Sequence, residues 1–253
     1  MPTAKKLGAV ANRYDEQLVV SRLPYASPLH AIQDYEAVKL SSFYPRGSVL
    51  FVEGQTPRGV FFLCEGRAKV SVTSPEGKTV VLRIAQPGEL LGVDAAITGR
   101  PYEGTAETIE RCRVDFVGCA DLLRILDRDK QAYFGVVQSL SNKFSGVVDQ
   151  FRVLLLSQSA AEKLARLLIR WCDETGKCTP EGIRVNPGLT HEEIGQMICA
   201  SRETVTRVLG EFRRRQIVHL ARNSILVRNR RALEAVANCW ERPDDVTAIT
   251  AID

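Results

Sequence analysis

Short runs of hydrophobic residues alternate with turn-forming residues between about Phe43 and Val117. The runs include SVLFVEG, VFFLCEG, AKVSVTS and TVVLRIA, which are rich in β-branched and aromatic residues and are separated by Gly, Pro and Ser. Short strands at such regular intervals are typical of a β-sandwich or barrel. The segment SPEGKT between two of these runs predicts a hairpin turn rather than a site.

Near Asp129 the hydrophobic spacing changes to alternating steps of four and three. Seven residues follow this heptad pattern: Tyr133, Val137, Leu140, Phe144, Val147, Phe151 and Leu154. The pattern predicts one long helix with an apolar stripe. The stripe could pack on the chain's own β region or on the same helix of a second copy. Because the flanking positions are polar, we expect the second arrangement, a homodimer.

From about Ser157 the pattern indicates a group of shorter helices. SAAEKLARLLIRWCDETG predicts an amphipathic helix that ends at Gly176, followed by a loop through Gly188. Thr190 and Glu193 have the spacing of a capping box, and Ser201 is expected to cap the next helix. Two helices joined by the short link ICA form a helix-turn-helix pattern, and IVHL and SILVR on either side of ARN predict a wing hairpin.

The second helix of this pair, within ASRETVTRVLGEFRRR, has two different faces. At about 100° per residue, one arc carries Arg202, Glu203, Thr206 and Arg207. The opposite side carries Val205, Val208, Leu209 and Phe212. Taken alone, the polar arc could be a solvated surface. Next to a second capped helix, it predicts a face that reads DNA bases.

The chemistry of these side chains assigns a role to each. Arg202 and Arg207 can each donate two hydrogen bonds to a guanine, and Glu203 can accept from a cytosine amino group. Thr206 is expected to contact a phosphate or a methyl group. Contacts to DNA phosphates are expected from Ser201, Arg213, Arg214, Arg215 and Arg222.

Composition and charge support a polyanion-binding surface in the last part of the chain. The 253 residues are 45% hydrophobic and 25% charged, which is ordinary for a folded soluble protein, and the net charge is only +4. Nine arginines and two glutamates lie between Arg202 and Arg231, so the rest of the chain is slightly acidic. Concentration of the positive charge in one block is expected for nucleic-acid binding.

Other chemistry is sparse. The seven cysteines are odd in number, scattered and without a C-x-x-C pair, so we expect reduced thiols in packed positions, with a redox-sensing thiol as the alternative and Cys199 as its candidate. Since no Ser-His-Asp set or phosphate-binding loop stands out, the sequence predicts that the protein is not an enzyme. Without a signal-like or membrane-spanning apolar run, we expect a cytoplasmic protein.

Three stretches together resemble a known family. GSVLFVEGQTPRGVFFLCEGRAKVSVTSPEGKTVVLRIAQPGELLG, the heptad helix and LTHEEIGQMICASRETVTRVLGEFRRRQIV are similar, in this order, to the Crp/Fnr family of bacterial transcription regulators. The resemblance covers roughly residues 30 to 240. It implies an α+β fold: an N-terminal antiparallel β jelly roll like a cyclic-nucleotide-binding domain, a long dimerisation helix and a C-terminal winged helix-turn-helix.

The resemblance also implies domain limits, a target and partners. We expect a sensory domain with an N-terminal helical extension at 1–128, the dimerisation helix and hinge at 129–157, the DNA-binding domain at 158–240 and a flexible tail at 241–253. The match to SRETVxR of the catabolite-activator branch implies TGTGA-like half-sites in double-stranded DNA. RNA polymerase would be a partner if the protein is an activator. A regulatory module of an enzyme or transporter is the alternative, and the helix-turn-helix argues against it.

The effector is expected in the β domain, and the resemblance places its pocket around six residues: Glu89, Leu91, Gly92, Val93, Thr105 and Ala106. Cyclic AMP binders of the family have a Glu where Val93 stands and an Arg-Ser pair where Gly104 and Thr105 stand. We therefore expect no useful cyclic AMP affinity.

The family's other known sensing groups also match poorly. The first 63 residues contain no cysteine, which excludes the family's iron–sulfur cluster. His30 is the only histidine near the β domain, and we expect it to be a surface residue rather than a haem ligand. The identity of the effector is left open.

Overall fold

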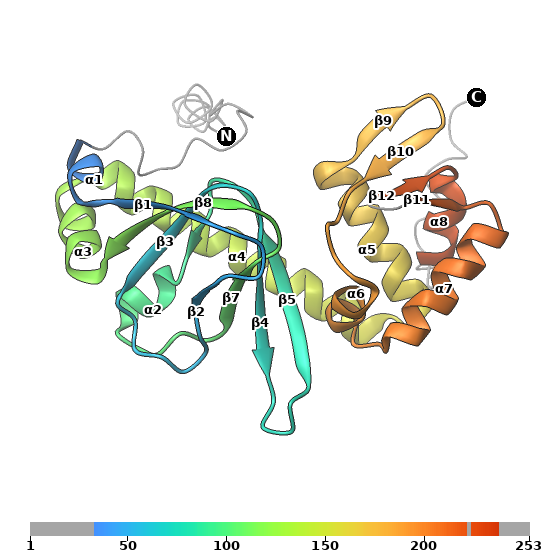
Figure 1. Ribbon diagram of the computed structural model, residues 1–253, viewed down its shortest axis with the longest axis horizontal. Coiled ribbons are helices and arrows are strands. Elements are labelled where there is room, and N and C mark those ends of the chain that lie inside the picture. Colours follow the sequence, from blue (N-terminus) through green and yellow to red (C-terminus); the bar gives the residue numbers. More distant parts are fainter. Residues whose placement is uncertain (1–32, 222–223, 238–253) are drawn as a thin grey trace, which may run out of the picture.

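The computed structural model describes residues 33–221 and 224–237. Most of the predicted N-terminal extension, Arg222 and the predicted tail at 241–253 lie outside these residues. The described chain forms a β-rich part and a mostly helical part, with one long helix running from the first to the second (Figure 1).

Eight strands form the β-rich part, and they make two four-stranded antiparallel sheets in the orders β1-β8-β3-β6 and β2-β7-β4-β5. Their bounds are β1 Leu40–Tyr44, β2 Val49–Phe51, β3 Gly59–Glu65, β4 Ala68–Thr73, β5 Thr79–Ala85, β6 Leu90–Leu91, β7 Thr105–Thr108 and β8 Cys112–Gly118. Three short helices accompany the sheets: α1 Gln33–Val38, α2 Val93–Thr98 and α3 Cys119–Arg128. This arrangement confirms the predicted jelly roll, which we call the β-roll. The predicted hairpin at SPEGKT joins β4 to β5.

A buried carboxylate ties α1 and β1 to the middle of the β-roll. Asp115 on β8 is fully buried, and it accepts hydrogen bonds from Tyr35 Oη at 3.0 Å and Ser41 Oγ at 2.6 Å. Lys39 Nζ lies 3.5 Å from the same carboxylate. Burial alone would raise the pKa of Asp115, but the hydrogen bonds from Ser41 and Tyr35 outweigh it and lower the pKa. The carboxylate therefore stays charged inside the domain.

The long helix α4, Lys130–Leu156, begins as predicted at Asp129, whose carboxylate accepts hydrogen bonds from the backbone N–H groups of Gln131 and Ala132. Ala132 and Val136 pack into the core of the β-roll. Five residues of the predicted stripe are exposed in the single chain: Tyr133, Val137, Phe144, Val147 and Phe151. Leu140 and Leu154 are half-buried, and Leu140 also packs against the β-roll.

The C-terminal part has four helices and a third antiparallel sheet of order β11-β12-β10-β9. Its elements are α5 Ala160–Thr175, β9 Lys177–Thr179, β10 Gly182–Val185, α6 His191–Ile198, α7 Arg202–Arg214, β11 Val218–Ala221, β12 Ser224–Val227 and α8 Arg230–Ala237. The hairpin of β11 and β12 confirms the predicted wing. This part is therefore a winged helix-turn-helix.

The expectation of a plain loop from Gly176 to Gly188 is wrong, because this segment contains β9 and β10. Each strand is only three or four residues long, and the two are joined through a tight turn before Gly182, so neither has a recognisable hydrophobic alternation. What holds β10 in place is its pairing with β12, about 40 residues further along the chain. Such a distant partner cannot be read from local spacing.

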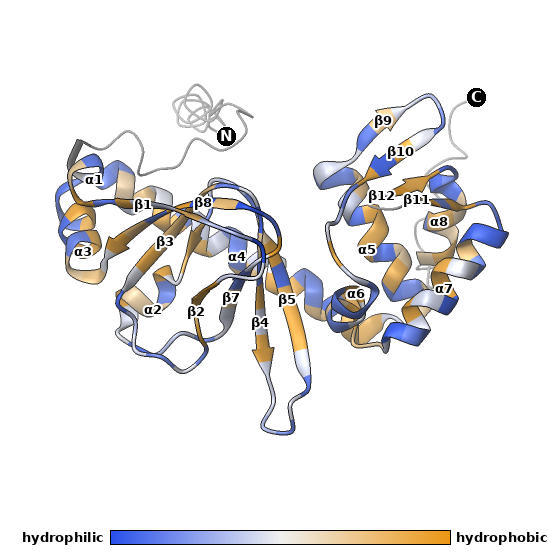
Figure 2. Cartoon of the chain, in the orientation of Figure 1, coloured by the Kyte–Doolittle hydropathy of each residue, from blue (hydrophilic) through white to orange (hydrophobic). Residues whose placement is uncertain are grey.

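The core of the winged domain forms from the apolar faces of its helices. Figure 2 shows hydrophobic and hydrophilic stretches alternating along α5 and α7. The buried residues include Leu164, Leu168, Trp171, Ile194, Val205, Leu209, Phe212 and Val227. Val81 of β5 is buried in the same cluster, and Ile84 packs against it. The β-roll and the winged domain thus share a contact surface along β5 and α6.

Candidate nucleic-acid interface

The two helices of the helix-turn-helix begin at the predicted caps. Thr190 and Glu193 form the capping box of α6, with the Thr190 hydroxyl accepting from the Glu193 N–H and the Glu193 carboxylate accepting from the Thr190 N–H. Ser201 Oγ accepts from the Thr204 N–H at the start of α7. Between them, Cys199 adopts a left-handed backbone with φ 53°, which turns the chain sharply from one helix into the next.

The two faces of α7 lie as the sequence predicts. Val205, Val208, Leu209 and Phe212 are buried in the winged-domain core. Arg202, Glu203, Thr206 and Arg207 are all exposed, and because the sequence predicts that they read DNA bases, we call these four residues the reading face. A hydrogen bond from its own backbone N–H, with a smaller contribution from Ser201, lowers the pKa of Glu203. The reading face therefore presents one carboxylate acceptor between two guanidinium donors.

A histidine that the sequence did not point to fixes one residue of the reading face. The Thr206 hydroxyl donates to the Arg202 carbonyl at 2.9 Å, and His191 Nδ1 lies 2.9 Å from the same hydroxyl oxygen. Since the hydroxyl has one hydrogen, this arrangement requires Nδ1 of His191 to carry the proton and to donate to Thr206. His191 thus links the first turn of α6 to α7. The two residues are 15 positions apart, so only the packing of the helices brings them together.

The residues predicted to contact phosphates lie at both ends of α7. Ser201 at its start uses its hydroxyl to cap the helix. Arg213 and Arg214 in its last turn are exposed and have no ion pair within the described residues. Arg215 approaches Glu211 at 3.8 Å. These cations form an exposed positive border at the C-terminal end of the helix, and Arg222 lies outside the described residues.

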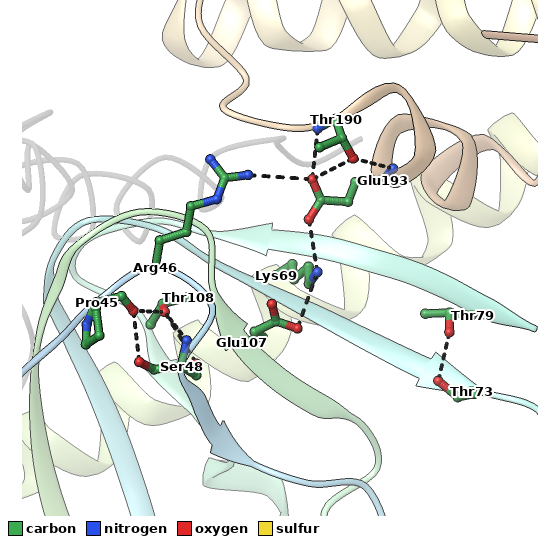
Figure 3. Close-up of polar contacts among 10 residues, drawn as sticks. All are labelled: Pro45, Arg46, Ser48, Lys69, Thr73, Thr79, Glu107, Thr108, Thr190 and Glu193. Atoms are coloured by element: carbon green, nitrogen blue, oxygen red, sulfur yellow. Dashed lines mark hydrogen bonds and ion pairs between the residues drawn. The ribbon is translucent and has the colours of Figure 1, made fainter. Parts of the chain in front are cut away.

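A polar cluster joins the β-roll to the first helix of the pair (Figure 3). Lys69 Nζ on β4 lies 2.9 Å from the Glu193 carboxylate and 3.3 Å from Glu107. Arg46 reaches Glu193 at 4.0 Å. Burial alone would raise the pKa of Glu193, but hydrogen bonds from Thr190 and Lys69 lower it. The same carboxylate therefore caps α6 and holds the β-roll, a second role that the capping-box spacing did not reveal.

Most of the predicted effector residues are packed in the β-roll. Leu91, Val93 and Ala106 are buried in its two hydrophobic clusters. Gly92 has φ 75° at the start of α2, and Thr105 Oγ1 accepts from the Glu53 N–H at 3.0 Å. Of the six, Glu89 borders a cavity of about 870 Å³ beside α4, where it accepts from the Gln86 N–H and pairs with Arg83.

Two of the residues that stand where the family has its nucleotide ligands, Val93 and Gly104, differ from those ligands in chemistry. Val93 has an apolar side chain with no exposed surface. A side chain at Gly104 would begin 3.0 Å from the Ser71 carbonyl, so an arginine there would require the neighbouring strand to shift. Neither of these two residues therefore has a side chain that can hydrogen-bond to a ribose or pair with a phosphate.

The described cysteines differ in exposure. Burial raises the pKa of Cys64 to about 12 and that of Cys172 to about 11, so both stay protonated near neutral pH. Cys112 is also buried, whereas Cys178 and Cys199 are exposed. Among residues 33–221 and 224–237, no group of three or more His, Cys, Asp or Glu side chains is arranged to hold a metal ion. Within the same residues, no helix is long and apolar enough to cross a membrane.

A β-roll of cyclic-nucleotide-binding type followed by a winged helix with an exposed basic reading face defines a DNA-binding transcription regulator. Two family models match the chain: the cyclic nucleotide-binding domain over residues 42–129 and the Crp-like helix-turn-helix domain over residues 162–236. The chain belongs to the Crp/Fnr family of regulators, as its sequence predicted.

Several similar proteins are transcription regulators. The chain is 28% identical to a CRP-like cAMP-activated global transcriptional regulator of Mycobacterium tuberculosis over 73% of its own length and 82% of the relative's. It is 23% identical to a global nitrogen regulator of Synechocystis, over 75% and 85% of the two chains. A CRP-family transcriptional regulator from Thermus thermophilus has a similar structure, with a TM-score of 0.67, 25% identity and coverage of 78% and 96%. FixK2 from Bradyrhizobium japonicum shares the fold at a TM-score of 0.69, with 18% identity and coverage of 79% and 97%.

Proposed function

We propose that the protein binds an inverted repeat with TGTGA-like half-sites as a homodimer and that a signal sensed in its β-rich part controls this binding. The observation that carries the proposal is the reading face of α7, whose polar side chains are exposed while the opposite side of the helix is buried. Arg202 and Arg207 read guanines through O6 and N7, and Glu203 accepts from a cytosine amino group.

Thr206 is exposed, but its hydroxyl group already forms hydrogen bonds within the protein, which limits how it can contact DNA. Its hydroxyl is held by Arg202 and His191, so its methyl group is the part left to contact a base or the backbone. Arg213, Arg214, Arg215 and Arg222 contact phosphates, together with Ser201 at the start of the helix. These contacts set the affinity and its salt dependence without reading the sequence.

A symmetric dimer explains the exposed stripe of α4. Phe144 is 71% exposed and Phe151 is 58% exposed in the single chain, and covering such side chains with the partner's stripe is favourable. A two-fold axis along the stripe requires half-sites about one helical turn apart, roughly 10–10.5 bp from centre to centre.

The effector is not cyclic AMP bound in the family's manner, an iron–sulfur cluster or a haem. Val93 and Gly104 support the first exclusion, and the cysteine and histidine positions support the other two. The protein acts in the cytoplasm, where its DNA target lies, and contacts RNA polymerase if it activates transcription.

Selection of binding sites from random DNA duplexes tests the proposal. We expect palindromic sites with TGTGA-like arms. Arg207→Ala should weaken the best site by about 1–3 kcal/mol and relax the preference at one guanine. Its matched control is Arg214→Ala, which should weaken all sequences alike and reduce the slope of log affinity against log salt by about 1. Recovery of sites without paired arms, or loss of specificity from Arg214→Ala alone, would show that the reading face has been wrongly assigned.

A further inference from the structure

The cavity beside α4 lies between the β-roll and the winged domain. Its volume of about 870 Å³ is within the range of small-molecule sites. Arg83 and Glu89 line it from the β-roll, Asn142 and Lys143 from α4, and Trp171 from α5. A molecule in this cavity would touch both domains and the helix that runs between them.

The charged side chains around the cavity are mostly cations. Five basic residues and two acidic residues line it: Arg67, Arg83, Lys130, Lys143, Arg170, Glu89 and Glu174. The two carboxylates do not neutralise this set, because Glu89 pairs with Arg83 alone and Glu174 forms no ion pair among the described residues. Arg67 is engaged by Glu110, which lies outside the cavity lining. The site therefore has a surplus of positive charge.

Among the described residues, Lys130 and Lys143 of this lining form no ion pair, and Lys143 is the less exposed of the two. Within residues 33–221 and 224–237, no carboxylate or hydrogen-bond acceptor is in contact with its ammonium group, although it is only half-exposed. Burial, with a smaller contribution from Arg83, lowers the pKa of Lys143 to about 8. Burial also raises the pKa of Glu174. The pKa of a base is lowered here and that of an acid is raised, so the cavity disfavours a charge that lacks a partner. An anionic ligand would supply a partner for the Lys143 ammonium group.

The remaining walls are apolar. Phe134, Trp171, Leu167 and Met197 line the cavity from α4, α5 and α6. From this combination of an unpartnered ammonium group and aromatic walls, we propose that the cavity binds a small organic anion with a flat apolar group, its carboxylate or phosphate on Lys143. This inference deepens the proposed function by naming the chemical class of the effector, and its regulatory consequence rests on that function.

The cavity and the dimer stripe use different sides of α4. Gln138, Asn142 and Gly146 line the cavity at intervals of four residues. Phe144 lies two positions from Asn142, which is about 200° around the helix, and Val147 is the one stripe residue that also borders the cavity. A partner on the stripe would therefore leave most of the cavity open. A ligand on one side of α4 and a second subunit on the other gives the anion a direct route to the dimer and to α5.

Isothermal titration calorimetry with 1-naphthyl phosphate and 1-naphthoate tests the site on the full chain without DNA. We expect one anion per chain, with neutral 1-naphthol binding far more weakly. Binding of only one of the two anions identifies phosphate or carboxylate as the preferred head group. Lys143→Met should weaken anion binding by at least about tenfold, since a charged hydrogen bond is lost. Lys78→Met, in the exposed β4–β5 turn, is the matched control and should change nothing.

A second variant separates loss of binding from loss of folding. Gly146 lines the cavity, and a Cβ atom added there meets no atom within 4 Å, so we expect the side chain of Gly146→Leu to occupy part of the cavity. The same change replaces glycine inside a helix and should raise the melting temperature. We expect a more stable protein that no longer binds the anions.

Proton uptake gives a readout specific to Lys143. Burial lowers the pKa of Lys143 in the empty site and a bound anion raises it, so binding at a pH above about 8 should take up a proton. The charged groups that face Lys143 across the packed elements are Arg67, Arg83, Glu89, Asp94, Lys130, Arg170 and Glu174. Calorimetry in buffers of different ionisation enthalpy measures the uptake, which Lys143→Met should abolish.

Equal binding to wild type, Lys143→Met and Gly146→Leu, or no binding of either anion, would overturn the inference. Equal binding of 1-naphthol and the two anions would also overturn it. Because DNA is absent from these titrations, they are independent of the proposed function. If the chain binds the anions but selects no palindromic DNA, the anion site stands and the proposed function is wrong. If it selects palindromic DNA but binds no anion, the proposed function stands and the anion site is wrong.

Discussion

The β-roll and α7 both contain several basic residues, but most of those in the first are balanced by carboxylates and those in the second are not. In the β-roll, Arg67 contacts Glu110, Arg83 contacts Glu89 and Arg113 contacts Glu65. On α7, the guanidinium groups of Arg202 and Arg207 have no carboxylate partner within the described residues. Cations that pair with carboxylates of their own domain are neutralised there, whereas unpaired cations on one exposed face are available to an external polyanion. Whether the cations form ion pairs therefore distinguishes the two regions better than the number of cations does.

The largest expected effect concerns the proposed dimer. Phe144→Glu with Phe151→Glu should give monomers and weaken binding to a two-armed site by about 100-fold, because the second half-site no longer adds to the first. We choose these residues because both are exposed, whereas Leu140 also packs on the β-roll. Sedimentation velocity and gel-shift titration measure the two effects.

The control for this change is Leu123→Glu. It adds a carboxylate at a residue of α3 that is 45% exposed and lies outside the stripe. A double variant that stays dimeric, or a Leu123→Glu protein that dissociates, would contradict the assignment of the stripe.

Removal of the buried Asp115 carboxylate tests how much the charged contacts of the β-roll stabilise it. Asp115→Ala should lower the free energy of unfolding by about 3 kcal/mol, since it removes the shared acceptor of Tyr35 and Ser41. Glu65→Ala, in a largely exposed pair with Arg113, should cost less than about 1 kcal/mol. If urea unfolding gave similar decreases in the free energy of unfolding for the two variants, burial would not determine how much each carboxylate contributes.

Acid denaturation of the same variants follows from the pKa of Asp115. The folded value lies below the unfolded one, so the carboxylate stabilises the protein above about pH 4 and loses this contribution as the pH falls through its folded pKa. Asp115→Ala should therefore show a flatter fall in stability below about pH 4 than wild type.

Lys69 of the β-roll forms an ion pair with the winged domain. Lys69→Met should loosen the contact with Glu193 by about 1–2 kcal/mol, because both side chains are largely buried. Faster hydrogen exchange at the start of α6 is the expected result. Arg46→Met is the control, since Arg46 is more than half exposed and lies 4.0 Å from the same carboxylate. Equal exchange rates in wild type and Lys69→Met would mean that the pair does not hold the domains together.

The smallest expected effect lies in the turn of the helix-turn-helix. Cys199→Gly should stabilise the winged domain by about 0.5–1 kcal/mol, because glycine adopts the left-handed backbone without strain. Ala200→Gly, where the backbone φ is not positive, should be destabilising. Thermal unfolding measures both, and a loss of stability in Cys199→Gly would indicate that the thiol packs usefully in the turn.

Local signals in the sequence were strong for the helices. The heptad spacing located α4, the capping box located the start of α6, and the two-faced pattern of α7 separated its buried and exposed residues. Each of these features depends on neighbours within one or two helical turns, so the sequence contains them. The wing hairpin was equally local.

Contacts between residues far apart in the chain could not be predicted from the sequence. Asp115 and Tyr35 are 80 positions apart, and Lys69 and Glu193 are 124 apart. Likewise β10 exists because β12 lies beside it, and the cavity around Lys143 exists because α4, α5 and the β-roll meet there.

The sequence by itself therefore determined the kind of protein, its helix-turn-helix and the side chains that face outward, because periodicity and capping are encoded by residues close together in the chain. Only the tertiary structure decided which charges are paired, which predicted pocket residues are packed away and where an open site lies. The physical reason is that burial and ion pairing depend on which segments fold against one another, and this is a property of the whole chain.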